Sequence, residues 1–305
     1  MSEKYLDPAI SEIGYLVGDI SRACGRFAEL YEIQEWQEAR YTDSGKRSMR
    51  LYRYQPEQGL CFSLYEAGQE LWSPCRNPNR QSLHHICHEA PDFGEACAIA
   101  LRNGLYKFSE GVIESDSGTC PSAFFYDGAL TAVIQILERK DSAKPAVSIP
   151  NTILGKIGIG HIGYLTADRE VTLAHLERLY GLGEWLRVEY KPQKAWCYGK
   201  PTQGQYYVKA AVIPGATGCS WEINQAVTGG THRDYLESWP NRINHICHKI
   251  QDFEYWRDHF VRLGCTEKFA AEMEDDIMGY RRCFYAYDTV LDTIFELMEK
   301  PHFRR

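Results

Sequence analysis

Hydrophobic and polar residues follow a regular pattern along the chain, and the clearest stretch is residues 158–225. An apolar run at 160–166 predicts a strand. The apolar positions that follow recur at helical spacing and predict a helix over about 169–180, ended by glycine. After the helix come three β-rich runs, at 185–190, 206–213 and 219–227. The stretch therefore predicts one βαβββ module.

This module recurs, because short sequences repeat along the chain. Ile-Gly-Tyr-Leu at 13–16 returns at 162–165, and His-Ile-Cys-His at 85–88 returns at 245–248. Each copy opens a strand-like run, so four modules are expected. A polar segment with two prolines, residues 139–150, has the composition of a linker. We therefore expect two tandem halves of paired modules, residues 1–140 and 151–305.

The composition is that of an ordinary globular protein. Of 305 residues, 44% are hydrophobic and 25% charged, and the net charge of −7 comes without a basic cluster, which does not favour a nucleic acid or membrane partner. There is neither an apolar run of about 18 residues nor a secretory signal pattern. The 11 cysteines form no CxxC pair and indicate reduced thiols. We expect a cytoplasmic monomer or homodimer with a small-molecule substrate.

Two histidines and two glutamates occupy matched positions in the second half. His161 and His245 each open the first strand of a module, and Glu222 and Glu296 lie in the last strands. Paired modules related by a pseudo-twofold axis would bring the four side chains together, because alternate residues of a strand point to one face. Two imidazoles and two carboxylates suit one divalent ion such as Zn, Ni, Co, Mn or Fe(II).

Glu296 supports this hypothesis, because it lies in an otherwise apolar strand at 293–298. Burying an unpaired carboxylate is costly, so a glutamate there needs a partner. The alternative is a strand whose glutamate face is wet, which is the usual state of glutamate. Four such residues in symmetric positions favour the metal site.

The βαβββ modules, their pairing and the His…Glu…His…Glu pattern resemble the vicinal oxygen chelate superfamily, which includes glyoxalase I, methylmalonyl-CoA epimerase, extradiol ring-cleaving dioxygenases and bleomycin-resistance proteins. The most specific pieces are Leu-His-His-Ile at 83–86, Asn-His-Ile at 244–246 and Ile-Phe-Glu-Leu at 294–297. As architecture the resemblance covers nearly the whole chain. It implies an α+β fold in which each half is a curved open-barrel sheet with flanking helices. It also implies the metal ligands His161, Glu222, His245 and Glu296.

The first half departs from this pattern. At the four matching positions it has Glu12, Ser63, His85 and Gln135. Only one histidine remains and serine is a poor ligand, so we expect a site that has lost its metal and supports the fold or shapes the substrate pocket. Glu66 lies near Ser63 but points to the other face of a regular strand, and a second metal is not expected.

Other residues are weaker candidates. His84, His88 and His248 alternate away from the ligand face and are expected at the surface or in packing, whereas His232, in a predicted loop at 228–240, could border the site. Several side chains on later strands could line a barrel pocket: Tyr207, Lys209, Tyr285 and Tyr287. No GxGxxG or P-loop is present, so no nucleotide cofactor is implied.

The favoured function is a metal-dependent isomerase or epimerase. The metal would bind two oxygens of a small hydroxy-carbonyl substrate and stabilise an enediolate, with Glu222 and Glu296 as the catalytic acid and base. The first alternative is an extradiol-type Fe(II) ring-cleaving dioxygenase that uses His161, His245 and Glu296. Glu222 counts against it, because a fourth ligand fills a position needed by O₂ and substrate. The second alternative is a metal-free protein that binds a small molecule.

Overall fold

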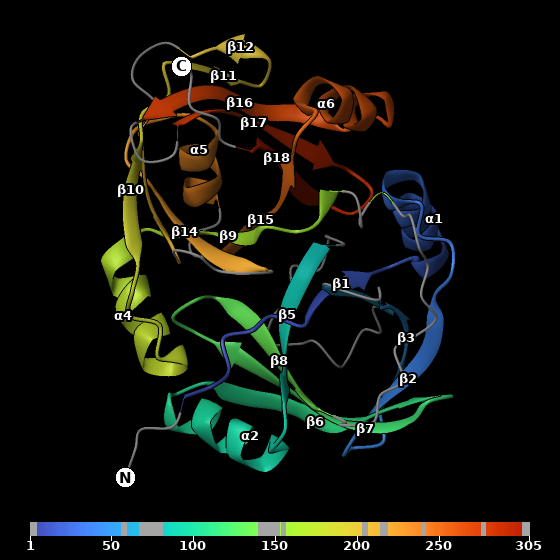
Figure 1. Ribbon diagram of the computed structural model, residues 1–305. Helices are drawn as coiled ribbons and strands as arrows, with labels where there is room; N and C mark the ends of the chain where they lie inside the picture. Colours follow the sequence, from blue (N-terminus) through green and yellow to red (C-terminus); the bar gives the residue numbers. More distant parts are fainter. Residues whose placement is uncertain are drawn as a thin grey trace. The chain divides into compact units, whose positions relative to one another are not determined.

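A computed structural model of the chain, shown in Figure 1, describes residues 5–55, 60–66, 82–139, 153, 157–202, 207–213, 219–238, 242–275 and 279–300. The predicted linker lies outside these ranges from residue 140 onward. Within them, no helix combines the length and apolar content that crossing a membrane requires.

The first half contains two modules with the predicted order of elements. One module consists of β1 (Glu12–Val17), α1 (Ile20–Tyr31), β2 (Gln37–Asp43), β3 (Ser48–Tyr54) and β4 (Cys61–Glu66). The other consists of β5 (Ser82–Ala90), α2 (Phe93–Arg102), β6 (Tyr106–Ser115), β7 (Gly118–Asp127) and β8 (Ala132–Glu138). Asp19 and Asp92 begin the two helices as N-caps, each accepting a hydrogen bond from a backbone N–H of the first turn.

The second half repeats this order with insertions. Its first module consists of β9 (His161–Leu165), α4 (Arg169–Tyr180), β10 (Leu186–Tyr190), β11 (Lys194–Cys197), β12 (Lys200–Pro201), β13 (Val208–Val212) and β14 (Ser220–Ala226). After α5 (Thr231–Ser238), the second module consists of β15 (Arg242–Ile250), α6 (Phe253–Arg262), β16 (Thr266–Asp275), β17 (Gly279–Asp288) and β18 (Thr293–Glu299). The four-module α+β fold is therefore confirmed, and the hairpin β11–β12 and helix α5 are additions to the predicted elements.

The two sheets differ in how they close. The first is a closed barrel with strand order β1-β4-β3-β2-β6-β7-β8-β5. Its interior is filled by its own side chains, among them Tyr41, Tyr65 and Phe124, whose rings meet edge to face. This half therefore forms a full barrel where an open one was expected, because β2 pairs with β6.

The second sheet stays open. Its order is β10-β13-β14-β9-β15-β18-β17-β16-β11-β12, so the strands that correspond to β2 and β6, namely β10 and β16, are not neighbours in the described sheet. The hairpin β11–β12 instead pairs with β16. A pocket lies inside this sheet, whereas the corresponding space in the first barrel holds an aromatic core.

Contacts divide the chain into two compact units. The first contains Met1–Gly155 and Ala174–Gly183, and the second contains Lys156–Leu173 and Glu184–Arg305. Helix α4 therefore begins in the second unit and ends in the first. Its end is held there by His175, whose Nε2 lies 2.6 Å from an Asp127 carboxylate oxygen, and by Tyr180, whose hydroxyl lies 2.9 Å from Nε2 of His88.

Candidate metal centre

Four adjacent strands of the second sheet carry the predicted ligand residues. Strand β9 is parallel to β14, where Gly163 lies beside Glu222, and antiparallel to β15, where Gly163 lies beside His245. Strand β15 is parallel to β18, where Cys247 lies beside Glu296. The registers therefore bring His161, Glu222, His245 and Glu296 to one face of the sheet.

Gly163 makes room for His245. A Cβ atom at this position would lie 1.9–2.4 Å from three atoms of the His245 ring, closer than any real contact. The first half has the same arrangement, with Gly14 against His85 at 1.9–2.5 Å. The glycine of the repeated Ile-Gly is therefore required because a histidine ring on the neighbouring strand lies against the strand backbone there.

The four side chains meet at short range. Nε2 of His161 lies 3.1 Å from Oε2 of Glu296, Nε2 of His245 lies 3.1 Å from the same oxygen, and the two Nε2 atoms lie 3.4 Å apart. Oε2 of Glu222 is 3.3 Å from Nε2 of His161 and 3.6 Å from that of His245. Over the described part of the chain this is the one group of His, Cys, Asp or Glu side chains whose possible ligand atoms gather in this way, all within 4.8 Å.

This donor set fits one metal ion. Bonds of about 2.1 Å at right angles place neighbouring donor atoms about 3 Å apart, close to the three shortest separations here. The four residues are also buried, so the two glutamates need compensating positive charge, which a bound cation would supply. Burial raises the pKa of Glu296, but the charge of His245 and hydrogen bonds from His161 and His245 outweigh it and bring the pKa to about 2. The carboxylate is therefore held in its ligand form.

Neighbouring polar groups orient two of the four residues. Nδ1 of His245 lies 3.1 Å from Oδ1 of Asn244, which can only accept, so Nδ1 donates in this bond and Nε2 is the nitrogen that faces the two glutamates. Tyr190 donates from its hydroxyl to Oε1 of Glu222 at 3.0 Å, and Asn224 donates from Nδ2 to Oε2 at 2.8 Å. Burial and the charge of Glu222 hold the pKa of Tyr190 well above its usual value, so its hydroxyl remains a donor.

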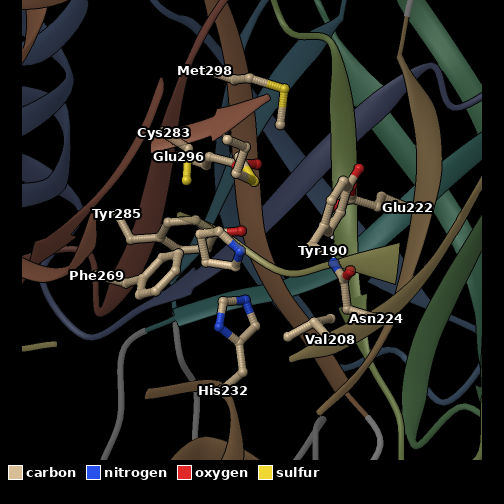
Figure 2. Close-up of a pocket in the computed structure, with 12 residues that line it drawn as sticks. Tyr190, Val208, Glu222, Asn224, His232, Phe269, Cys283, Tyr285, Glu296 and Met298 are labelled. Atoms are coloured by element: carbon tan, nitrogen blue, oxygen red, sulfur yellow. Dashed lines mark hydrogen bonds between the residues drawn. The ribbon is translucent and has the colours of Figure 1, made fainter. Parts of the chain in front are cut away.

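A pocket opens onto this cluster, with about 350 Å³ of space that protein atoms do not fill, open solvent included. Figure 2 shows Phe269, Tyr285 and His232 gathered on one side of it, with Tyr190 and Glu222 opposite. Aromatic, thioether and aliphatic side chains dominate its lining: Tyr190, Pro192, Val208, Glu222, Asn224, His232, Phe269, Met273, Cys283, Tyr285, Glu296 and Met298. A small apolar molecule whose polar end faces the glutamates suits such a pocket.

His232 lies in helix α5 and not in the predicted loop. Its ring is buried, edge-on to Phe269 with centroids 5.5 Å apart and to Tyr285 with centroids 5.1 Å apart. Tyr285 in turn lies 4.9 Å from the ring of His245. Burial, followed by the charge of His245, lowers the pKa of His232 to about 4, so its imidazole is neutral near pH 7.

The matching positions of the first half hold a different network. Oε2 of Glu12 accepts from the Arg53 guanidinium at 2.6 and 2.9 Å, and Nε2 of His85 lies 3.0 Å from Oε1 of Gln135. Glu12, His85, Gln135 and Ser63 are all buried, and Arg53 is only 19% exposed. Sequence reasoning missed Arg53, because Arg50 and Arg53 look alike in a strand with a polar face.

The three histidines predicted to point away from the ligand face differ in burial. His84 is half-buried, whereas His88 and His248 are buried, with Nδ1 of His88 2.8 Å from the Ala9 carbonyl and Nδ1 of His248 2.7 Å from that of Gly158. Tyr285 lines the pocket, whereas Tyr207, Lys209 and Tyr287 are not among the lining residues. Glu66 pairs with Arg50 at 3.1 Å.

Tyr190 and Asn224 were also missed as site residues, although the sequence carried a signal for each. Tyr190 aligns with Tyr41 in the repeat, and Asn224 shares a strand face with Glu222.

The sequence matches no family model and no curated protein. Solved structures do match it. A mutant of 4-hydroxymandelate synthase from Streptomyces coelicolor is 10% identical over 98% of this chain and 94% of that chain, with a TM-score of 0.63. A xylose isomerase-like TIM barrel/4-hydroxyphenylpyruvate dioxygenase fusion protein is 12% identical over 99% of this chain, with a TM-score of 0.58.

This chain spans half the length of the fusion protein. A TIM barrel is built from eight parallel strands alternating with helices, and the described sheets are largely antiparallel. The likeness therefore falls on the dioxygenase portion.

These likenesses correct the prediction of a metal-dependent isomerase or epimerase, because the matched titles are those of a synthase and a dioxygenase. Architecture, register and structural likeness together show that this chain has the paired-module fold of the vicinal oxygen chelate proteins.

Proposed function

We propose that this protein is an Fe(II)-dependent dioxygenase that acts on a small aromatic molecule carrying two neighbouring oxygen atoms. His161, His245 and Glu296 would hold the iron. The observation that carries the proposal is the triangle of their ligand atoms, with sides of 3.1, 3.1 and 3.4 Å. Two histidines and one carboxylate on one face of an ion are the ligand set of non-haem iron oxygenases, and bound iron would supply the redox chemistry between O₂ and a chelated substrate.

The pocket supports an aromatic substrate. Phe269 and Tyr285 offer ring faces and edges beside the cluster, and Met273 and Met298 add sulfur atoms that contact aromatic rings favourably. The described lining contributes no lysine or arginine, so the body of the substrate is uncharged and its oxygens face the cluster. The matched synthase and dioxygenase carry aromatic hydroxy compounds in their titles, which agrees with this class.

His232 is suited to bind a hydroxyl of the substrate. Its imidazole is neutral, lies inside the pocket beside Tyr285, and offers a ring nitrogen that can accept a hydrogen bond from that hydroxyl. Burial of the whole group excludes water from the ligand atoms and limits side reactions there. We assign His232 the role of a hydrogen-bond acceptor for the substrate and Tyr285 that of a substrate-orienting residue.

Oxygen consumption tests the proposal. Protein loaded anaerobically with one equivalent of Fe(II) would be mixed with O₂ and either a catechol series or 4-hydroxyphenylpyruvate, and O₂ uptake and ¹⁸O incorporation measured. We expect uptake matched to substrate loss, with label in the product. His245→Ala should abolish uptake and metal retention, while Gln135→Ala, at the matching position of the first half, should retain both. Iron-loaded protein that binds these compounds without consuming O₂ would contradict the proposal.

A further inference from the structure

Glu222 is a second carboxylate in a cluster where the proposed iron site, with two histidines and one carboxylate, needs only one. The structure shows how this additional group is held. Its Oε2 lies 3.3 and 3.6 Å from the two histidine nitrogens, whereas Oε2 of Glu296 lies 3.1 Å from both. Glu222 is therefore the more distant of the two carboxylates from the centre of the cluster. Glu222 is also only 1% exposed, so its carboxylate cannot turn away from the cluster into solvent.

Two uncharged side chains donate hydrogen bonds to the Glu222 carboxylate. Tyr190 donates to Oε1 and Asn224 donates to Oε2, so each carboxylate oxygen has a protein partner that does not depend on a metal. The Tyr190 ring is itself fixed, because the buried Arg281 guanidinium lies 5.5 Å from its centroid. A carboxylate held in this way can leave an ion without being left unpaired.

The two halves of the chain show that these residues form a set. The strand registers place Tyr65 at the position of Asn224 and Ser63 at that of Glu222. Where the carboxylate is absent, its amide donor is absent too. Tyr41, at the position of Tyr190, shares its hydrogen bond with Ser109 in place of a glutamate.

We infer that Glu222 is a displaceable fourth ligand, and that Tyr190 and Asn224 are positioning residues that keep its carboxylate beside the ion and receive it when substrate oxygens take its place. This inference rests on the proposed metal site and resolves the objection that a fourth ligand blocks a dioxygenase. Oxygen-chelating substrates require adjacent open positions, and exchange of Glu222 supplies one of them.

Cobalt binding tests the inference without catalysis. Metal-free protein would be titrated anaerobically with Co(II), followed by visible absorption, and the loaded protein then titrated with 4-nitrocatechol as the chelating probe. For Glu222→Gln we expect opposite changes, with Co(II) binding about 10–100-fold weaker and the probe binding tighter, because the competing ligand is gone. For Tyr190→Phe we expect Co(II) binding weaker by about 10–100-fold, the usual effect of losing an outer hydrogen bond.

Tyr207→Phe is the matched control, because Tyr207 also donates to a glutamate, Glu189 at 2.7 Å, but outside the pocket. It should leave both affinities unchanged. If Glu222→Gln weakens Co(II) binding and also weakens the probe, Glu222 is a permanent ligand and the inference is wrong. If neither affinity changes, Glu222 is not a ligand and the inference is equally wrong, while the proposed dioxygenase stands. Wild-type protein that binds no Co(II) would overturn both.

Discussion

Gly163 and His245 form the most demanding single contact of the site. The ring of the histidine lies where a side chain at position 163 would begin, and the same is true of Gly14 and His85 in the first half. The short sequence repeat therefore has a steric cause: one strand must lack a side chain so that a histidine ring from the next strand can occupy that space.

We predict that Gly163→Ala displaces the His245 ring. Overpacking of a buried position costs about 1–3 kcal/mol, so the free energy of unfolding should fall by that amount, and metal binding should weaken because Nε2 of His245 moves. Denaturant unfolding and metal titration measure the two effects.

Gly25→Ala is the control for this substitution. Gly25 lies in α1 with nothing within 4 Å of its Cβ position, so alanine should stabilise the protein by about 0.5–1 kcal/mol. A Gly163→Ala protein with unchanged stability and metal affinity would show that the ring adapts.

At the scale of strands, the two halves use the same positions for different purposes. Strands β9 and β14 carry His161 and Glu222, whereas β1 and β4 carry Glu12 and Ser63. The small Ser63 lies beside Arg53 of β3, and the Arg53 guanidinium bonds to Glu12 inside the first barrel. The first half therefore neutralises its buried carboxylate with a side chain of its own.

This ion pair should be essential for the first barrel. Arg53→Met leaves Glu12 charged and buried, and removing one member of such a pair costs about 3–5 kcal/mol. Adding Glu12→Gln should restore much of that loss, since no charge is then left unpaired. Unfolding measurements on the single and double variants form the test.

Arg50→Met is the comparison variant. Arg50 lies on the same strand, but its pair with Glu66 is exposed at 39% and 40%, so the loss should be far smaller than that of Arg53→Met, because solvent screens an exposed ion pair. Equal losses for Arg50→Met and Arg53→Met would refute the special role of the buried pair.

Sequence periodicity and repeats were enough to predict the four modules and the strands that carry the four cluster residues. They could not predict that the first sheet closes. Closure depends on pairing between β2 and β6, which belong to different modules and lie far apart in the sequence. Helix α5 was missed because it is short and follows two glycines. Arg53 was missed because its burial depends on the small residue on a neighbouring strand. Metal ligation by the cluster stays a prediction.

Across the whole molecule, buried neutral histidines link stability to pH. Burial lowers the pKa of both His88 and His248 to about 4, whereas an unfolded histidine titrates near 6.5. Below pH 6.5 the unfolded chain therefore binds more protons than the folded one. The stabilisation is complete above this pH and is lost as the pH falls towards 4.

We expect the free energy of unfolding to fall by about 1.4 kcal/mol per pH unit for each of these histidines between pH 6 and 4.5. Denaturant unfolding over a pH series, with a chelator present to remove metal effects, would measure the slope. His248→Gln should reduce it by the share of one histidine. A slope that this substitution leaves unchanged would assign the pH dependence to other groups.

The open second sheet also bears on how copies of the chain behave towards one another. A sheet that does not close has free strand edges, and an unprotected edge invites pairing with a second molecule. Among the described strands these edges are β10 and β12. Strand β12 consists only of Lys200–Pro201, and β10 is followed by Lys191 and Pro192. Proline offers no N–H to a second strand, so we expect the sheet to stay open for the pocket without pairing edge to edge with another copy of the chain.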